Sequence, residues 1–351
     1  MGALRARAAI EASGIGGERL ARAGVRIVQS TRGWASMGPL DALRKIPSLL
    51  SICIRTAAKL RAKPPDLLVL VDFGAFNVRL AWLLRRFGFK RPIVYYAPPS
   101  AWLDNPKRAR AVAMLSDPLT FFRHQAEFYR RLGLPIGYVG HPLVSTILPR
   151  ALRPAPPPGG GTIALLPGSR AGEIEHHTPL LLDALARVRE IRPDVTAVLV
   201  AADDDAQRLV EHFLNFRSPL PVTLVRDARA ALRDVDAAVI ASGTAVLEAA
   251  LVQTPSASLY VMAEPQAKIA RRMYRGRYIT LPNLVLDEPL IPELLQESAT
   301  PGAIADVLLA LLHDPARQLD GYARLRAALG PPDALQRNAD WVLAAAAEPA
   351  V

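Results

Sequence analysis

The stretch "LLPGSRAGEIE" occupies residues 165–175, and it has the form of a strand that hands over to a helix. An apolar run ends at Pro167, a tight corner follows at Gly168-Ser169-Arg170, and helical spacing begins after it. Backbone N–H groups at a helix start are unpaired and carry partial positive charge, so this corner suits a phosphate. Gly and Ser also make ordinary turns and caps. On this stretch alone both interpretations stay open.

Short apolar runs alternate with helical patterns on both sides of this stretch. Continuous apolar strands that alternate with helices indicate parallel sheets covered on both faces. We therefore predict an α/β fold with two doubly wound, Rossmann-like domains that face a cleft. The predicted strands are 25–30, 66–72, 92–97, 161–168, 195–202, 221–227, 236–242 and 255–261.

A proline- and glycine-rich segment marks the predicted domain boundary. In "RPAPPPGGGT" (153–162), prolines followed by glycines disfavour both helix and central strand, which indicates a linker. The predicted organisation is an N-terminal Rossmann-like domain, a linker, a C-terminal Rossmann-like domain and a C-terminal helix. These parts span 1–152, 153–161, 162–330 and 331–351.

Composition restricts the class of protein and its partners. The chain has 351 residues, 51% of them apolar, and its single cysteine, Cys53, excludes an internal disulfide. No apolar run approaches the roughly 18 residues of a membrane span. The net charge of +11 favours anionic partners. The arginines are scattered and no nucleic-acid-binding motif occurs, so we expect no nucleic-acid partner.

Polar residues follow several predicted strands at their carboxyl ends, which is where doubly wound sheets bind ligands. Asp72 ends one strand, and Ser100 and Trp102 follow the next. The Gly168-Ser169-Arg170 corner and Ser242-Gly243-Thr244 end two strands of the second half. All of these residues are therefore expected to face one cleft.

The second helix start, in "ASGTAVLEAAL" (241–251), carries Glu248 about one turn into its helix. Such a start can accept a diphosphate, and a nearby carboxylate can accept hydrogen bonds from a ribose diol. The alternative is a capped helix with a solvated glutamate. Asp72 is likewise either a general base that takes a proton from a hydroxyl, or an N-cap or turn aspartate before the helix that starts near Asn77.

The sequence offers weak support for a metal site, and we predict none. Three aspartates, 203–205, follow a strand, where acidic residues more often cap a helix than hold a cation. His176 and His177 are adjacent and point to different faces of their helix, which is poor ligand geometry.

Residues 37–63 form an amphipathic segment with lysines and arginines. Pro47 is expected to break it into two short helices. Its apolar residues suit either a lipid surface or ordinary core packing.

Taken together, six motifs resemble the lipid-A-disaccharide synthase family, in that family's order and approximate spacing. They are "VDFGAFN" (71–77), "APPSAW" (97–102), "VGHPLV" (139–144), "LLPGSRAGEIE" (165–175), "ASGTAVLEAAL" (241–251) and "YITLPNLVLDEPLIPELLQE" (278–297). The family pattern opens with a strand, a glycine-rich loop and a helix, and these are missing here.

The resemblance implies a GT-B glycosyltransferase that joins UDP-2,3-diacylglucosamine to 2,3-diacylglucosamine 1-phosphate. The reaction inverts the anomeric centre and releases UDP, without a metal or other cofactor. The resemblance also implies a cytoplasmic protein attached peripherally to the inner membrane, with a homodimer as an option. The alternatives are another UDP-sugar GT-B enzyme, or a catalytically impaired relative that binds UDP or lipid.

The same resemblance makes 1–152 the acceptor and lipid side and 162–330 the UDP-sugar-binding side. It also implies roles for individual residues. Asp72 matches the proposed base on the acceptor 6-hydroxyl, and Arg170 matches an essential arginine. Asn283 matches a polar residue on the nucleotide side, and Glu248 looks like a ribose-binding glutamate. Ser100 and Trp102 fall on the acceptor side.

Overall fold

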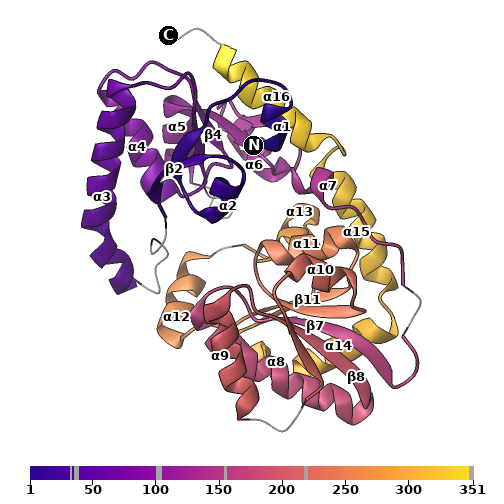
Figure 1. Ribbon diagram of the computed structural model, residues 1–351. Helices are drawn as coiled ribbons and strands as arrows, with labels where there is room; N and C mark the ends of the chain where they lie inside the picture. Colours follow the sequence, from indigo (N-terminus) through magenta and orange to yellow (C-terminus); the bar gives the residue numbers. More distant parts are fainter. Residues whose placement is uncertain are drawn as a thin grey trace. The chain divides into compact units, whose positions relative to one another are not determined.

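The computed structural model describes residues 1–31, 34, 39–99, 105–153, 156–216, 220–274 and 276–347. The chain forms two compact units (Figure 1). Unit 1 consists of Met1–Ser145 and Gly330–Val351, and unit 2 of Thr146–Leu329. The predicted C-terminal segment thus packs with unit 1, although it follows unit 2 in the chain.

Unit 2 is built on a six-stranded parallel sheet in the order β12-β11-β10-β7-β8-β9. The two halves of the sheet diverge from the β7–β10 pair, which makes it a topological switch point. The prediction of a doubly wound α/β fold is confirmed here. The strands are β7 (Gly160–Leu166), β8 (Asp194–Val200), β9 (Val222–Val225), β10 (Ala237–Ala241), β11 (Ser256–Tyr260) and β12 (Glu293–Leu295).

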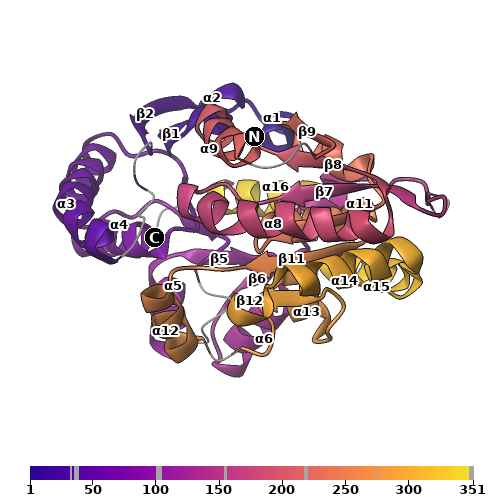
Figure 2. The same cartoon turned by 90° about the horizontal axis from the view of Figure 1, so that it is seen from below.

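Two groups of helices pack around this sheet, as expected for apolar strands whose two faces are both buried. In one group α8 (Ala171–Ile191) contacts α9 (Asp204–Asn215) and α14 (Pro301–His313), which Figure 2 shows from below. In the other, α11 (Thr244–Val252) contacts three helices. These are α10 (Ala228–Arg233), α13 (Leu281–Leu286) and α15 (Ala316–Leu329). The remaining elements of unit 2 are α12 (Glu264–Met273) and the 3₁₀ turn η1 (Gln296–Ser298), while α7 (Leu143–Thr146) spans the boundary between the two units.

Strand β7 begins at Gly160, inside the predicted linker 153–161. Gly160 pairs with Asp194 and Gly161 with Val195 of β8. Glycine weakens a strand but keeps its backbone donor and acceptor. The β8 ladder therefore extends over two residues whose composition disfavoured a central strand.

Unit 1 contains two parallel sheets. One is a pair, β1 (Ser13–Gly16) and β2 (Arg26–Ser30), and the other has four strands in chain order, β3 to β6. The four are β3 (Leu68–Val71), β4 (Ile93–Tyr96), β5 (Asp117–Thr120) and β6 (Gly137–Tyr138). The helices are α1 (Gly2–Arg5), α2 (Glu18–Arg22), α3 (Pro39–Ala62), α4 (Gly74–Arg86), α5 (Pro106–Leu115), α6 (Arg123–Arg131) and α16 (Ala334–Ala347).

The prediction that Pro47 breaks residues 37–63 into two helices is wrong, because α3 runs through Pro47 without interruption. A proline inside a helix costs about 3 kcal/mol. The buried side chains of Ile52, Cys53 and Ala57 pack in one core cluster with α4, and this burial offsets that cost.

Candidate active site

Two glycine corners lie at the same edge of the unit 2 sheet. Strands β7 and β10 are parallel neighbours, with Leu166 opposite Ile240. Gly168-Ser169-Arg170 follows β7, and Ser242-Gly243-Thr244 follows β10. The structure therefore brings both predicted corners to the switch point, where doubly wound sheets bind their ligands.

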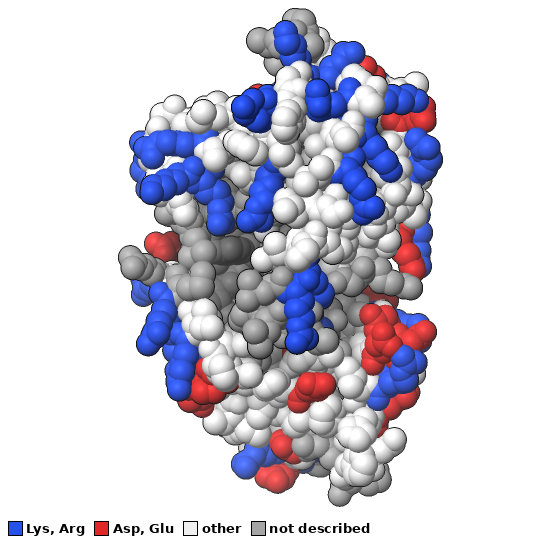
Figure 3. Space-filling view, turned by 90° about the vertical axis from the view of Figure 1, so that its left-hand side faces the viewer, with Lys and Arg blue, Asp and Glu red and all other residues white. Residues whose placement is uncertain are grey.

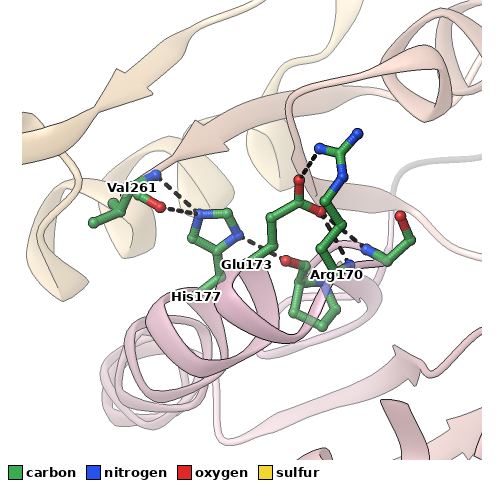
Figure 4. Close-up of polar contacts among 6 residues, drawn as sticks. Arg170, Glu173, His177 and Val261 are labelled. Carbon is green, nitrogen blue, oxygen red and sulfur yellow. Dashed lines mark hydrogen bonds and ion pairs between the residues drawn. The ribbon is translucent and has the colours of Figure 1, made fainter. Parts of the chain in front are cut away.

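The corner between β7 and α8 is filled by a carboxylate of its own chain (Figure 4). Glu173 Oε2 accepts from the N–H groups of Ser169 at 3.1 Å and Arg170 at 3.4 Å, and Oε1 lies 2.6 Å from Arg170 Nη1. Gly168 has φ +118°, and a Cβ there would lie 2.5 Å from Glu173 Oε2. The backbone donors predicted to hold a phosphate are thus already engaged.

Glu173 was missed as a site residue, although the sequence carried a signal for it. It lies three residues after Arg170, which is the N-cap of α8. A Glu at the third helical position that reaches back to the N-cap is the capping-box pattern. Arg170 itself keeps 67% of its side chain exposed, so the guanidinium is accessible to a ligand.

The corner between β10 and α11 is open by comparison. Gly243, the N-cap of α11, is extended, with φ 165°, and within the described part of the chain no side chain caps this helix. A Cβ on Gly243 would come no closer than 4.0 Å to a neighbouring atom. This corner has both the unpaired donors and the space that an anion requires.

Glu248 lies on α11 and is held by an arginine of the preceding helix. Its Oε1 accepts from Arg229 Nη2 at 2.6 Å, and its side chain is 20% exposed. The pair orients the carboxylate on α11, about one turn after the open corner. It leaves Oε2 for a further donor such as a ribose hydroxyl.

Asn283 is buried and its amide is fully engaged within unit 2. Nδ2 donates to the Ile291 carbonyl at 2.8 Å and to Glu293 Oε1 at 2.9 Å, and Oδ1 accepts from Ile291 N–H at 2.7 Å. Glu293 also accepts from the N–H and hydroxyl of Thr280 at 2.9 and 2.7 Å. Asn283 therefore shapes the turn around it, instead of offering a free amide.

In unit 1, Asp72 follows β3 in a strained turn. Asp72 and Phe73 both have positive φ, 44° and 36°, a conformation that costs a non-glycine residue about 1–3 kcal/mol. The Asp72 carbonyl accepts from Tyr95 Oη at 2.8 Å and Asn77 Nδ2 at 2.9 Å. Burial, together with the charge of Asp72, raises the pKa of Tyr95, so its hydroxyl stays protonated and donates.

That turn leaves the Asp72 side chain exposed beyond the strand. Helix α4 begins at Gly74 with Phe73 as its N-cap, so Asp72 is not the N-cap, but it does lie in the turn before the helix, as the alternative interpretation expected. Ser100 and Trp102, predicted for the acceptor side, lie outside the described residues.

The three aspartates after β8 serve the protein itself. Asp203 caps α9 by accepting from Ala206 N–H at 2.9 Å, Asp204 pairs with Arg226, and Asp205 pairs with Arg208. Within the described ranges, no group of three or more His, Cys, Asp or Glu side chains is placed to hold a metal ion. Nor does any helix there have the length and apolar character needed to cross a membrane.

Two α/β units built on parallel sheets, one of them with a switch point at the β7–β10 pair, are the fold of GT-B glycosyltransferases and of related epimerases. The calicheamicin glycosyltransferase CalG4 has this fold, with a TM-score of 0.61 and 17% identity over 99% of this chain and 94% of that one. A UDP-N-acetylglucosamine 2-epimerase from Neisseria meningitidis also has this fold, with a TM-score of 0.58 and 13% identity over 93% of this chain and 87% of that one.

Sequence comparison identifies the family within this class. The family model described as lipid-A-disaccharide synthetase matches residues 1–332. A lipid-A-disaccharide synthase of Pseudomonas aeruginosa is 36% identical over 98% of this chain and 92% of its own length. The Pseudomonas entomophila enzyme of the same name is 37% identical over 94% of this chain and 89% of its own length. The chain belongs to the lipid-A-disaccharide synthase family, as its motifs predicted.

Proposed function

We propose that this chain is an inverting glycosyltransferase that joins UDP-2,3-diacylglucosamine to 2,3-diacylglucosamine 1-phosphate and releases UDP. Family membership supports the reaction. The single structural observation that carries it is the pair of adjacent helix starts at the β7–β10 switch point, one of them uncapped. That arrangement suits the diphosphate of a sugar nucleotide.

In the proposed reaction the acceptor 6-hydroxyl oxygen attacks the anomeric carbon of the donor. The bond from that carbon to the UDP oxygen breaks, so negative charge grows on the diphosphate while the sugar becomes oxocarbenium-like. The N–H groups at the start of α11 and the Arg170 guanidinium stabilise this charge, and one such donor is worth about 3 kcal/mol. One displacement at one face inverts the anomeric centre.

The Asp72 carboxylate takes the proton from the attacking hydroxyl. Its exposure leaves the carboxylate accessible to an acceptor. The contacts of Tyr95 and Asn77 with its carbonyl hold the strained turn, which pre-organises the base.

The remaining site residues have supporting roles in this proposal. Glu248, oriented by Arg229, accepts from the ribose hydroxyls of UDP. Asn283 acts indirectly, by holding the turn on the nucleotide side through its contacts with Ile291 and Glu293. Ser100 and Trp102 stay predictions for the acceptor side.

Helix α3 is the surface that we propose for peripheral contact with the anionic inner membrane, on its cytoplasmic side. Ile46, Leu50 and Ile54 are 49%, 47% and 53% exposed and recur every four residues, so they form one apolar stripe. Figure 3 looks onto the side that carries α3, where Lys and Arg side chains lie among uncharged ones. Apolar and cationic groups together suit an anionic lipid surface.

The test is disaccharide formation from the two acylated precursors in detergent. We expect Asp72→Asn and Arg170→Ala to lower kcat at least about 100-fold. Asp66→Asn, an exposed carboxylate before the same strand, is the control for Asp72. Arg208→Ala is the control for Arg170, because its side chain is 70% exposed and is also paired three residues away.

Each outcome separates this reaction from its rivals. Full activity of Asp72→Asn and Arg170→Ala would contradict the mechanism. Turnover with another UDP-sugar but not with the diacylated donor would identify a different glycosyltransferase. UDP binding by the wild type without turnover of any donor would leave a binding protein.

A further inference from the structure

His177 is a buried imidazole directly behind the β7–α8 corner. It lies on α8 one turn after Glu173, and its exposed fraction is 0%. Nδ1 lies 2.7 Å from the carbonyl oxygen of Pro167, and Nε2 lies 2.9 Å from the N–H nitrogen of Val261 (Figure 4). One side chain thus joins the residue after β7 to the residue after β11.

The contacts and the burial of the ring together indicate its protonation. A carbonyl oxygen only accepts, so Nδ1 carries the hydrogen and donates to Pro167. Nε2 lies within reach of both the N–H and the carbonyl of Val261, and burial disfavours the charged ring, so Nε2 accepts from the N–H and His177 is neutral. The family mechanism described above makes no use of this group.

We propose that His177 is a positioning residue for the donor site. It fixes the Pro167 carbonyl and so sets the place of Gly168-Ser169-Arg170 relative to the chain that leaves β11. The inference rests on the proposed function, because it takes Arg170 to contact the donor diphosphate.

The corner has few other anchors. Pro167 has no N–H to donate, and Gly168 has φ +118°, a conformation outside any strand or helix. Glu173 accepts from the Ser169 N–H group and from the Arg170 guanidinium. His177 holds the other end of the corner, because its Nδ1 donates to the Pro167 carbonyl. Without the His177 contact, a buried carbonyl loses its partner and the corner can shift, and shifts of about 1 Å impair catalysis.

Protonation of His177 would change its contact with Val261, while Nδ1 would still donate to Pro167. A second ring proton on Nε2 removes the acceptor for Val261 N–H and instead faces the Val261 carbonyl, 3.1 Å away. The charged and titratable neighbours are Glu173 and His176 on α8, with the Tyr260 ring of β11 at 5.9 Å. Burial lowers the pKa of His177, so the neutral form persists below pH 6.5 and is lost only in more acidic solution.

The experiment compares His177→Asn and His177→Gln with His176→Gln, a matched control on the adjacent, exposed histidine. An Asn amide can replace the Nδ1 donor to Pro167, and a Gln amide can replace the Nε2 acceptor for Val261. We measure the Kd for UDP by calorimetry, then KM for the donor and kcat, with melting temperatures for every variant. UDP binding by His177→Gln should weaken about tenfold and by His177→Asn about threefold at most.

The donor KM should rise more than kcat falls, because the corner holds UDP in the ground state as well as in the transition state. The terminal phosphate of UDP itself gains a proton near about pH 6, so UDP affinity should fall in acid in every variant. The fall should be steeper in wild type than in His177→Asn, and this difference reports on His177.

Equal Kd values for wild type, His177→Gln and His177→Asn would overturn the inference and leave the proposed function intact. An equal loss in His176→Gln would also overturn it. No UDP binding by the wild type would overturn the proposed function, and this inference with it.

Discussion

The two glycine corners of unit 2 share an edge and a sequence pattern, but different groups satisfy their backbone donors. At the β7–α8 corner, Glu173 accepts from two backbone N–H groups and from Arg170. At the β10–α11 corner, Gly243 begins a helix that has no side-chain cap in the part of the chain that the structure describes. At the first, closed corner the Glu173 carboxylate already occupies the backbone donors. At the second, open corner the backbone donors are available to the anion of a ligand.

The difference shows that two glycine corners at one edge of a sheet can serve two purposes. The closed corner fixes its loop and presents an arginine side chain, while the open corner offers backbone donors. A diphosphate would therefore take its backbone contacts from α11 and its side-chain contact from Arg170. The expectation that both corners bind phosphate through their backbone does not fit the contacts of Glu173.

The largest effect should come from making the open corner like the closed one. Gly243→Asp places a carboxylate at the N-cap of α11, where Asp is a preferred cap and has room. We expect UDP binding to weaken about 100-fold because the new charge occupies the anion site. The melting temperature should stay level or rise slightly. The neutral Gly243→Asn variant should lose less affinity, and an unchanged Kd in Gly243→Asp would refute the assignment of the open corner.

A second comparison concerns the two glycines themselves. Gly168→Ala forces a side chain into φ +118° and against Glu173 Oε2, so the free energy of unfolding should fall by about 2 kcal/mol. In Gly243→Ala the added methyl group meets open space on an extended backbone, so the free energy of unfolding should change by less than about 0.5 kcal/mol. Urea unfolding of both variants measures the contrast. Similar losses would mean that the corners are equally constrained.

The smallest effect should follow from partial opening of the closed corner. Glu173→Gln keeps an acceptor oxygen for one N–H group but removes the charge that faces Arg170. We expect a loss of about 1 kcal/mol in unfolding free energy, since the carboxylate is only 13% exposed. Glu175→Gln, two residues on and exposed, is the control. Equal stability of the two variants would show that Glu173 does not brace the corner.

Most of the six-stranded sheet of unit 2 could be predicted from the sequence, because its strands are continuous apolar runs. Strand β10, buried at all five positions, is an example. Strand β5 was missed because Asp117-Pro118 opens it and proline argues against an inner strand. Strand β12 has only three residues and lacks β-branched side chains, so local pattern does not reveal it. Pro47 led to the prediction of a helix break that the structure does not have, because tertiary packing keeps α3 intact.

The position of site residues was more predictable than their partners. Strand ends indicated Asp72, Arg170 and Gly243, because chain topology alone brings such residues to one edge of their sheet. Contacts with distant residues could not be read from the sequence. The hydrogen bond that Val261 N–H donates to His177 joins residues 84 positions apart. Asn283 accepts from the N–H group of Ile291, which lies on the other side of the same turn.

Unit 1 is assembled from two separated pieces of chain, and this has a consequence for biosynthesis. Val342 and Ala345 of α16 share a core cluster with Val94 and Leu119, and Asn338 Nδ2 donates to the Gly140 carbonyl at 3.0 Å. Unit 2 is continuous and can acquire its structure as it leaves the ribosome. Unit 1 contains the earlier part of the chain, yet its core is complete only after residues beyond 330 have been made.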